Sequence, residues 1–323
     1  MQVASLTYRL YKDKDLIEIL VLWEKNSGWG GITEAEFYDW FINTPTGPCT
    51  IIVAENEEGE IIGQLVFRPT KILMRGKEVD GYRAMAPILN DCYRETDIKN
   101  YNHPIFAMFR FGIEQAANRQ IDIIFSFPSI GWVAGVKTFP RYGLPKAEVS
   151  IFDCIGIDLK KTFALVVPEK NDWQVRVGKF SPVYETLWNK FVLNFPVNYA
   201  VSRSAIWHSW RRMDTLILEV YNRETAKLKG VFFIKKETNL MVDIIAETLE
   251  DAKQTLRLAA CWIYQNHTDD NISELKLMHT PFAEQLVQGI PNYPVNFRFG
   301  FFCLSPQNKA VPPIKEWFIM PNE

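Results

Sequence analysis

The sequence presents one order of secondary-structure elements twice, and this repetition limits what the chain can fold into. Each half reads as a strand, two helices, a meander of three strands, a long helix, a strand, a short helix and a final strand. Residue identity between the halves is negligible, so only the pattern repeats. Because 323 residues exceed the usual size of one hydrophobic core, we expect two domains of one α/β (α+β) design, each a mixed and mostly antiparallel sheet flanked by helices.

The first half is marked by local signals at its helix starts and turns. Thr33 and Glu36 have the spacing of a capping box and predict the start of the second helix, while Pro104 suits the first turn of the long helix. A polar run at 56–60 between two β-rich runs predicts a hairpin. The expected elements are strands at 8–11, 49–54, 61–70, 79–89, 121–127 and 146–157, a long helix over 105–119 and a short one over 131–139.

The second half repeats these signals. Thr248 and Asp251 have capping spacing and open a long helix, and Pro281 opens a short one. The expected strands lie at 174–180, 216–221, 230–235, 240–246, 275–278 and 295–303. We therefore expect one domain at 1–160, a linker near 158–172, a second domain at 173–304 and a tail at 305–323.

Charge and cysteine usage argue against several classes of function. The 36 Lys and Arg residues against 38 Asp and Glu give a net charge of −2, so no nucleic-acid partner is expected. The five cysteines are far apart and mostly lie in apolar runs, which predicts buried free thiols in a reducing compartment. No signal-like or membrane-spanning apolar run is present, so we expect a cytoplasmic protein without membrane association. The four scattered histidines predict no metal site.

The repeated order resembles that of the GNAT-superfamily acyltransferases, and the chain is similar to tandem members that carry two such domains. Short motifs add to this resemblance. They are Ile61-Ile62-Gly63-Gln64-Leu65-Val66, similar to the family's vvG strand; Phe127-Pro128-Ser129, similar to a segment after the fifth strand; Arg141-Tyr142-Gly143-Leu144, similar to the terminal L-G-F; and the Arg- and Trp-rich stretch at 203–213.

The resemblance implies an acetyl-coenzyme A or other acyl-coenzyme A donor, but the segment that would hold its pyrophosphate departs from the family pattern. In the family, a glycine-containing loop before the third helix offers backbone N–H groups to the phosphates. Here the connection at 93–104 contains no glycine and ends in Pro104, which has no N–H. The first half would then depend on Arg94 and Lys99 as cations. The second half has three acidic residues within 247–251, where phosphates would lie.

The resemblance also implies catalytic positions. The family's general acid, often a tyrosine, falls on Phe139, and Tyr142 is the candidate that replaces it. Asp91 and Glu95 are candidate bases near the end of the fourth strand, because the acceptor amine must lose a proton. The candidate cofactor-binding residues are Ile88, Leu89, Arg94, Lys99, His103, Ser126 and Ser129.

Three functional hypotheses follow. The first is acyl-coenzyme A-dependent N-acyltransfer to an amine, either a small molecule or a peptide. The second is a non-catalytic GNAT-like binding protein that kept the cleft and lost the cofactor loop. The third is a Fem-like transferase that takes an aminoacyl group from tRNA; the net charge of −2 counts against it.

Overall fold

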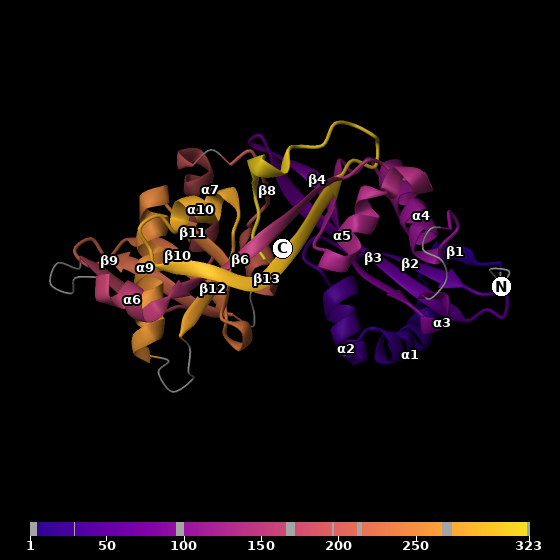
Figure 1. The fold of residues 1–323 in the computed structure, drawn as a ribbon, viewed down its shortest axis with the longest axis horizontal. Helices are drawn as coiled ribbons and strands as arrows, with labels where there is room; N and C mark the ends of the chain where they lie inside the picture. Colours follow the sequence, from indigo (N-terminus) through magenta and orange to yellow (C-terminus); the bar gives the residue numbers. More distant parts are fainter. Residues whose placement is uncertain are drawn as a thin grey trace. The chain divides into compact units, whose positions relative to one another are not determined.

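The computed structural model describes residues 5–28, 30–94, 100–165, 172–195, 197–211, 215–266 and 273–321. The chain divides into two compact units (Figure 1). Unit 1 comprises Met1–Ile72, Glu78–Ser150 and Gly300–Ile314, and unit 2 comprises Leu73–Lys77, Ile151–Phe299 and Lys315–Glu323. Each unit thus contains a segment from the other half of the sequence, so the units do not coincide with the ranges 1–160 and 173–304.

The first half forms its elements in the predicted order. The capping box is confirmed, because Glu36 N donates to Thr33 Oγ1 and Thr33 N donates to Glu36 Oε2. The elements are β1 (Thr7–Leu10), η1 (Asp13–Asp15), α1 (Leu16–Asn26), α2 (Glu34–Phe37), η2 (Tyr38–Ile42), β2 (Thr50–Glu55), β3 (Ile61–Met74), β4 (Lys77–Leu89), α3 (Asp91–Arg94), α4 (Pro104–Asn118), β5 (Ile123–Ser126), α5 (Ile130–Lys137), η3 (Phe139–Tyr142) and β6 (Glu148–Asp158).

The second half repeats that order with three additions that were not predicted. α6 lies in the stretch expected to be a linker, and β8 and β14 pair with each other in parallel. The elements are α6 (Leu159–Leu165), β7 (Trp173–Val177), α7 (Val183–Asn194), β8 (Tyr199–Val201), α8 (Ala205–Arg211), β9 (Leu216–Asn222), β10 (Leu228–Lys235), η5 (Lys236–Thr238), β11 (Leu240–Ala246), α9 (Leu249–Asn266), β12 (Glu274–Met278), α10 (Pro281–Leu286), β13 (Asn292–Leu304), η6 (Ile314–Glu316) and β14 (Trp317–Phe318).

Unit 1 is one mixed sheet with helices on both faces. Its strands lie in the order β1-β2-β3-β4-β5-β13, with β1–β2 and β2–β3 antiparallel and β4–β5 parallel. Side chains alternate across β2: Ile51 and Val53 pack with α1 and α2, whereas Ile52 and Ala54 pack with α4. α1 and α2 accordingly lie on one side of the sheet and α4 on the other (Figure 1).

Unit 2 has the same design. Its strands lie in the order β7-β9-β10-β11-β12-β6, with an antiparallel meander followed by the parallel pair β11–β12. Its core includes a buried ion pair, in which Arg203 Nε lies 3.0 Å from an oxygen of Asp243 on β11. The Arg203 guanidinium also stacks on Trp188, 4.5 Å from the ring centre. Arg203, part of the predicted Arg- and Trp-rich stretch, is therefore a core residue.

The last strand of each half pairs in the unit built mainly from the other half. Residues Cys154–Asp158 of β6 run antiparallel to β12 in unit 2. In unit 1, residues Phe302–Leu304 of β13 run antiparallel to β5. Because β6 and β13 hold equivalent places in the repeat, the two halves exchange the later parts of their final strands, from Ile151 in β6 and from Gly300 in β13.

Two further predictions from the sequence concern the burial of the cysteines and the presence of membrane-spanning helices. Cys154, Cys261 and Cys303 are buried free thiols as predicted, but Cys92 is exposed just beyond β4, so the prediction of burial is wrong there. No helix within the described residues is long and apolar enough to cross a membrane.

Candidate functional site

The candidate site in unit 1 is built where β4 leaves β5. The two strands pair in parallel from Gly81–Ile123 to Arg83–Phe125. Ser126 Oγ then donates to the Ala84 carbonyl at 2.7 Å, and β5 ends. β4 continues to Leu89, so its last residues extend beyond the end of this neighbour.

A backbone irregularity marks the same part of β4. Ala86 has a φ of 49°, in the left-handed region that a residue with a Cβ rarely adopts. Such a residue inside a strand interrupts the regular ladder, as a β-bulge does. Backbone polar groups that leave a ladder have to find other partners. Ala86 therefore marks an irregularity in the part of β4 that extends beyond the end of β5.

Three of the predicted site residues come together at this strand end. Arg94 Nη2 donates to the carbonyls of Leu89, at 3.0 Å, and Asn26, at 2.7 Å. Arg94 Nη1 lies 3.3 Å from an oxygen of Asp91, whose side chain is exposed. Asp91 N donates to Asn26 Oδ1. Arg94 therefore fastens α1 to the end of β4, and Asn26 is a site residue that sequence reasoning missed.

The start of α4, where the resemblance places the pyrophosphate, is closed by the chain itself. Ile105 N donates to His103 Nδ1 at 3.3 Å, and Phe106 N and Ala107 N donate to the His103 carbonyl. Pro104 has no N–H, and His103, Pro104, Ile105 and Phe106 are all buried. His103 is an N-cap, and the first-turn amides already have acceptors.

Tyr142 lies beside this helix start. Its ring stacks on Phe106, with the ring centres 3.9 Å apart, and it is 9% exposed. Arg110 Nη1 donates to the Tyr142 carbonyl and to that of Tyr101. Tyr142 and His103 therefore contact one ring, Phe106, from two segments.

The remaining predicted residues lie in different surroundings. Ile88 packs with α1 and α2, and Leu89, one residue on, packs with α4 on the opposite face. Ser126 is bonded to Ala84, and Ser129 is exposed at the start of α5 without a side-chain cap bond. Glu95 and Lys99 lie outside the described residues. The structure thus places Leu89, Asp91 and Arg94 together, and His103 with Tyr142.

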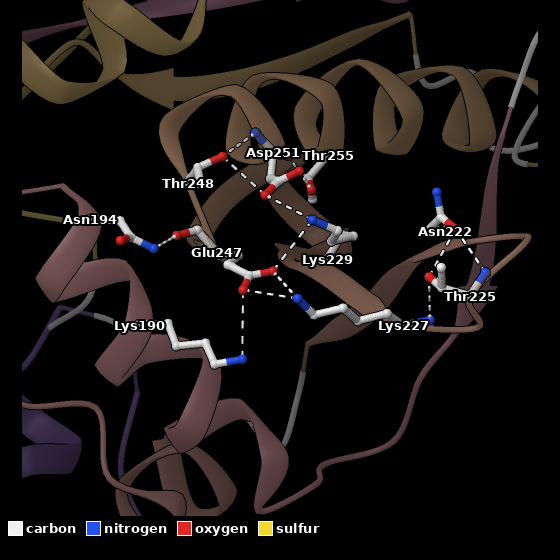
Figure 2. Close-up of polar contacts among 10 residues, drawn as sticks. All are labelled: Lys190, Asn194, Asn222, Thr225, Lys227, Lys229, Glu247, Thr248, Asp251 and Thr255. Carbon is white, nitrogen blue, oxygen red and sulfur yellow. Dashed lines mark hydrogen bonds and ion pairs between the residues drawn. The ribbon is translucent and has the colours of Figure 1, made fainter.

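In unit 2 the helix that corresponds to α4 is α9, and its start is crowded with charge. Glu247 lies 2.6 Å from Lys227, 3.3 Å from Lys229 and 3.6 Å from Lys190 on α7, all measured between Nζ and carboxylate oxygen (Figure 2). Lys229 also lies 3.5 Å from Asp251. We call Lys190, Lys227, Lys229, Glu247 and Asp251 the α9 charge cluster.

The α9 charge cluster holds the Glu247 carboxylate ionised. Hydrogen bonds from Lys227 and Lys229 lower the pKa of Glu247 from 4.5 to about 2, with burial acting in the opposite direction. Thr248 caps the helix, since Asp251 N donates to its Oγ1. Of the three acids expected at the phosphate position, Glu250 pairs with Lys253 on α9 itself, whereas Glu247 and Asp251 pair with lysines from β10, α7 and the turn before β10. The lysine partners of Glu247 and Asp251 come from distant sequence positions, so local sequence reasoning missed them.

Comparison with known proteins identifies the fold. No family model and no curated protein sequence matches the chain. Among solved structures, it is similar to a GCN5-related N-acetyltransferase from Anabaena variabilis (12% identity, TM-score 0.64, 93% of this chain and 72% of that one). It is also similar to Saccharomyces cerevisiae N-myristoyltransferase with bound myristoyl-CoA (11%, 0.60, 97% and 81%) and to a tandem GNAT protein from the clavulanic acid biosynthesis pathway (12%, 0.56, 94% and 99%).

These likenesses show a tandem GNAT fold, as the order of elements predicted. At identities near a tenth they show the fold alone. The residues described at the α4 start do not fit the coenzyme A pyrophosphate in the manner that the resemblance implies, because the first-turn amides are capped and buried.

Proposed function

We propose that unit 1 transfers an acyl group from a donor of the acyl-thioester class to an amine. The observation that supports this most directly is the end of β4, which extends past β5 and is interrupted at Ala86. A strand segment that has left its neighbour can bind an extended ligand through main-chain hydrogen bonds. Solved structures that share this fold include N-acetyl- and N-myristoyltransferases, which favours the same reaction class.

Asp91 is the residue that we propose as the base. Acyl transfer requires the amine to lose a proton before or as it attacks the carbonyl carbon, and the departing thiolate has to gain one. Asp91 is exposed, lies two residues after the end of β4, and has its carboxylate near Arg94. Tyr142 is the residue that we propose as the acid. Because Tyr142 is buried against Phe106, the departing thiolate would have to reach its hydroxyl inside the protein.

The alternative from a different class is a GNAT-like binding protein without catalysis. The capped and buried start of α4 favours it, because an anion there would have to displace the His103 cap. Arg94 would also have to leave two carbonyl partners to contact a phosphate. The aminoacyl-tRNA alternative has no observation in its favour among the described residues.

An activity measurement distinguishes the acyltransferase hypothesis from the binding-protein hypothesis. Thiol release from acetyl- and longer acyl-coenzyme A is measured with a panel of primary amines, for the parent chain and for Asp91→Asn. If Asp91 is the base, the variant should lose about 10²- to 10⁴-fold in rate. Glu58→Gln, an exposed carboxylate in the β2–β3 turn, is the matched control and should keep full activity.

Calorimetry with acetyl-coenzyme A decides the binding question without turnover. Heat of binding that Arg94→Ala weakens would support a donor held near the end of β4, provided that the melting temperature shows an intact fold. Absence of heat at millimolar ligand, together with no thiol release, would overturn the enzyme proposal and leave the binding-protein reading.

A further inference from the structure

α1 buries one face in its own unit and carries exposed aliphatic side chains on a second. Leu16, Ile19, Leu22 and Trp23 are buried against the sheet. A second stripe, at spacing i, i+3, i+4 and i+7, consists of Ile17, Leu20, Val21 and Glu24. Ile17 is 65% exposed and Val21 is 41% exposed. Exposed aliphatic side chains in such a stripe are typical of a contact surface.

This second stripe forms one wall of a groove of about 390 Å³. The opposite wall is made by Gly31, Ile32, Thr33 and Glu36. The two walls approach closely at Gly31, where a Cβ would lie 3.4 Å from the Cβ of Glu24. We call these eight residues the α1 groove.

The charges that line the α1 groove are both negative. Among the described residues, Glu24 and Glu36 line it and no lysine or arginine does. Glu36 is fixed in place, because its Oε2 accepts hydrogen bonds from Thr33 N and Thr33 Oγ1, both at 2.8 Å. These bonds also lower the pKa of the Glu36 carboxyl, so it is ionised at neutral pH. The groove therefore combines an aliphatic wall with a carboxylate that hydrogen bonds hold in position.

We propose that the α1 groove binds an amphiphilic amine, a small molecule with an aliphatic body and a primary ammonium group. The aliphatic part would cover Ile17, Leu20 and Val21, and the ammonium would pair with Glu24 and Glu36. The stripe lies on the face of α1 opposite to Trp23 and Asn26, which face the sheet and the end of β4. The groove is thus separate from the strand end at which we place acyl transfer.

Calorimetry on the full chain with n-octylamine, in the absence of any acyl donor, tests the proposal. We expect saturable binding that tightens about fourfold for each methylene added from hexylamine to octylamine. Octanoate, which has a similar chain and the opposite charge, should bind at least about tenfold more weakly. Equal binding of octanoate and octylamine would overturn the proposal.

Variants identify the groove as the site. Glu36→Gln removes the charge but keeps a side chain that can complete a capping box, and combined with Glu24→Gln it should weaken octylamine binding by about tenfold or more. Ile17→Ser should also weaken it. Glu34→Gln, beside the groove, and Leu193→Ser, a similarly exposed aliphatic on α7, are the controls and should have no effect. Unchanged binding in both groove variants would overturn the proposal.

Because binding is measured without a donor, this test is independent of the acyl-transfer proposal. Adding an acyl-coenzyme A then asks whether octylamine is acylated. Acylation that the groove variants abolish would contradict the separation of the groove from the strand end. Binding without acylation would support the groove as a separate amine site.

Discussion

The helices α4 and α9 hold the same place in the two units, and they begin in opposite ways. α4 starts with a buried, uncharged turn, in which His103 accepts the hydrogen bonds of the first amides. α9 starts inside a charge cluster, in which Glu247 is paired with lysines from three segments. The fold therefore fixes where a helix begins after the meander, and the local residues decide what chemistry that position presents.

This difference also separates fold from function. In both units the helix start has been given partners by the chain itself, so neither presents the open glycine loop that the resemblance implies. In unit 1 the partners at the start of α4 are uncharged, and the extended end of β4 has Asp91 and Arg94 nearby. In unit 2 the partners at the start of α9 form ion pairs. The candidate chemistry consequently rests on the end of β4 in unit 1.

The largest expected effect concerns the exchanged strands. A chain ending at residue 160 keeps β6 without its partner β12 and lacks Phe302–Leu304, the partner of β5. Unpaired strand edges are costly and prone to aggregation. We expect this fragment to show no cooperative thermal transition, in contrast to the full chain, when followed by circular dichroism and calorimetry.

Complementation sharpens this test. A synthetic peptide covering residues 297–314 should restore part of the transition to the fragment, whereas a scrambled peptide should not. A fragment that melts cooperatively by itself, at the temperature of the full chain, would show that the exchanged strands do not matter for unit 1.

The order of elements was predictable because it depends on local chemistry. Thr33 with Glu36, Thr248 with Asp251 and Pro104 each mark a helix start that the structure confirms. The strand exchange was not predictable, since β6 and β13 would have the same apolar pattern whichever sheet they joined. β8 and β14 were missed because three and two residues carry too little periodicity.

The second effect is the stability lost when a buried polar pair is broken, compared between the ion pair of unit 2 and a neutral pair of unit 1. Asp243→Ala removes the carboxylate that Arg203 contacts in a fully buried site and should cost about 3–5 kcal/mol. In unit 1, Trp23 Nε1 donates to Gln64 Oε1, also in the core. Gln64→Ala should cost less, about 1–3 kcal/mol, because it leaves no unpaired charge in the core. Urea unfolding of the two variants gives the comparison, and a costlier Gln64→Ala would contradict it.

The third effect is a pH dependence that belongs to the α9 charge cluster. Glu247 has a pKa of about 2 when folded and 4.5 as its ordinary value, so its pairing stabilises the protein above about pH 4.5. This stabilisation is lost as the pH falls from about 4.5 toward 2. Glu247→Gln should therefore cost about 1–2 kcal/mol at pH 7, where several pairs form a network, and progressively less as the pH falls below about 4.5.

Salt provides the control for the same variant. Ion pairs near the surface are screened at high ionic strength, so the cost of Glu247→Gln should shrink in 1 M NaCl. The cost of Gln64→Ala in unit 1 should not change in the same way. A cost of Glu247→Gln that is independent of both pH and salt would mean that the side chain acts through packing.

The candidate site was predictable only where its chemistry is local. Asp91 and Arg94 were identified because they follow the fourth strand, and the structure places them together. Asn26 was missed because it comes to Asp91 and Arg94 from a helix 65 and 68 residues away in sequence. The same reason applies to Lys190 in the α9 charge cluster, which reaches Glu247 from α7. Contacts between distant segments carry no local pattern.

The smallest effect compares one substitution at one motif in the two units. In both capping boxes a threonine Oγ1 accepts from the backbone N–H three residues on, at 3.2 Å for Thr33 and 3.1 Å for Thr248. Loss of such a cap costs about 0.5–2 kcal/mol. α2 is a four-residue surface helix, whereas α9 has 18 residues, packs in the core, and has its capping Asp251 also near Lys229. Thr248→Ala should therefore lie near the upper end of that range and Thr33→Ala near the lower end, as measured by the shift in urea midpoint.

Serine in place of either threonine keeps the hydroxyl and should restore most of the loss. Equal costs at the two positions would mean that the cap hydrogen bond alone sets the effect, and that the α9 charge cluster adds nothing to the helix it begins.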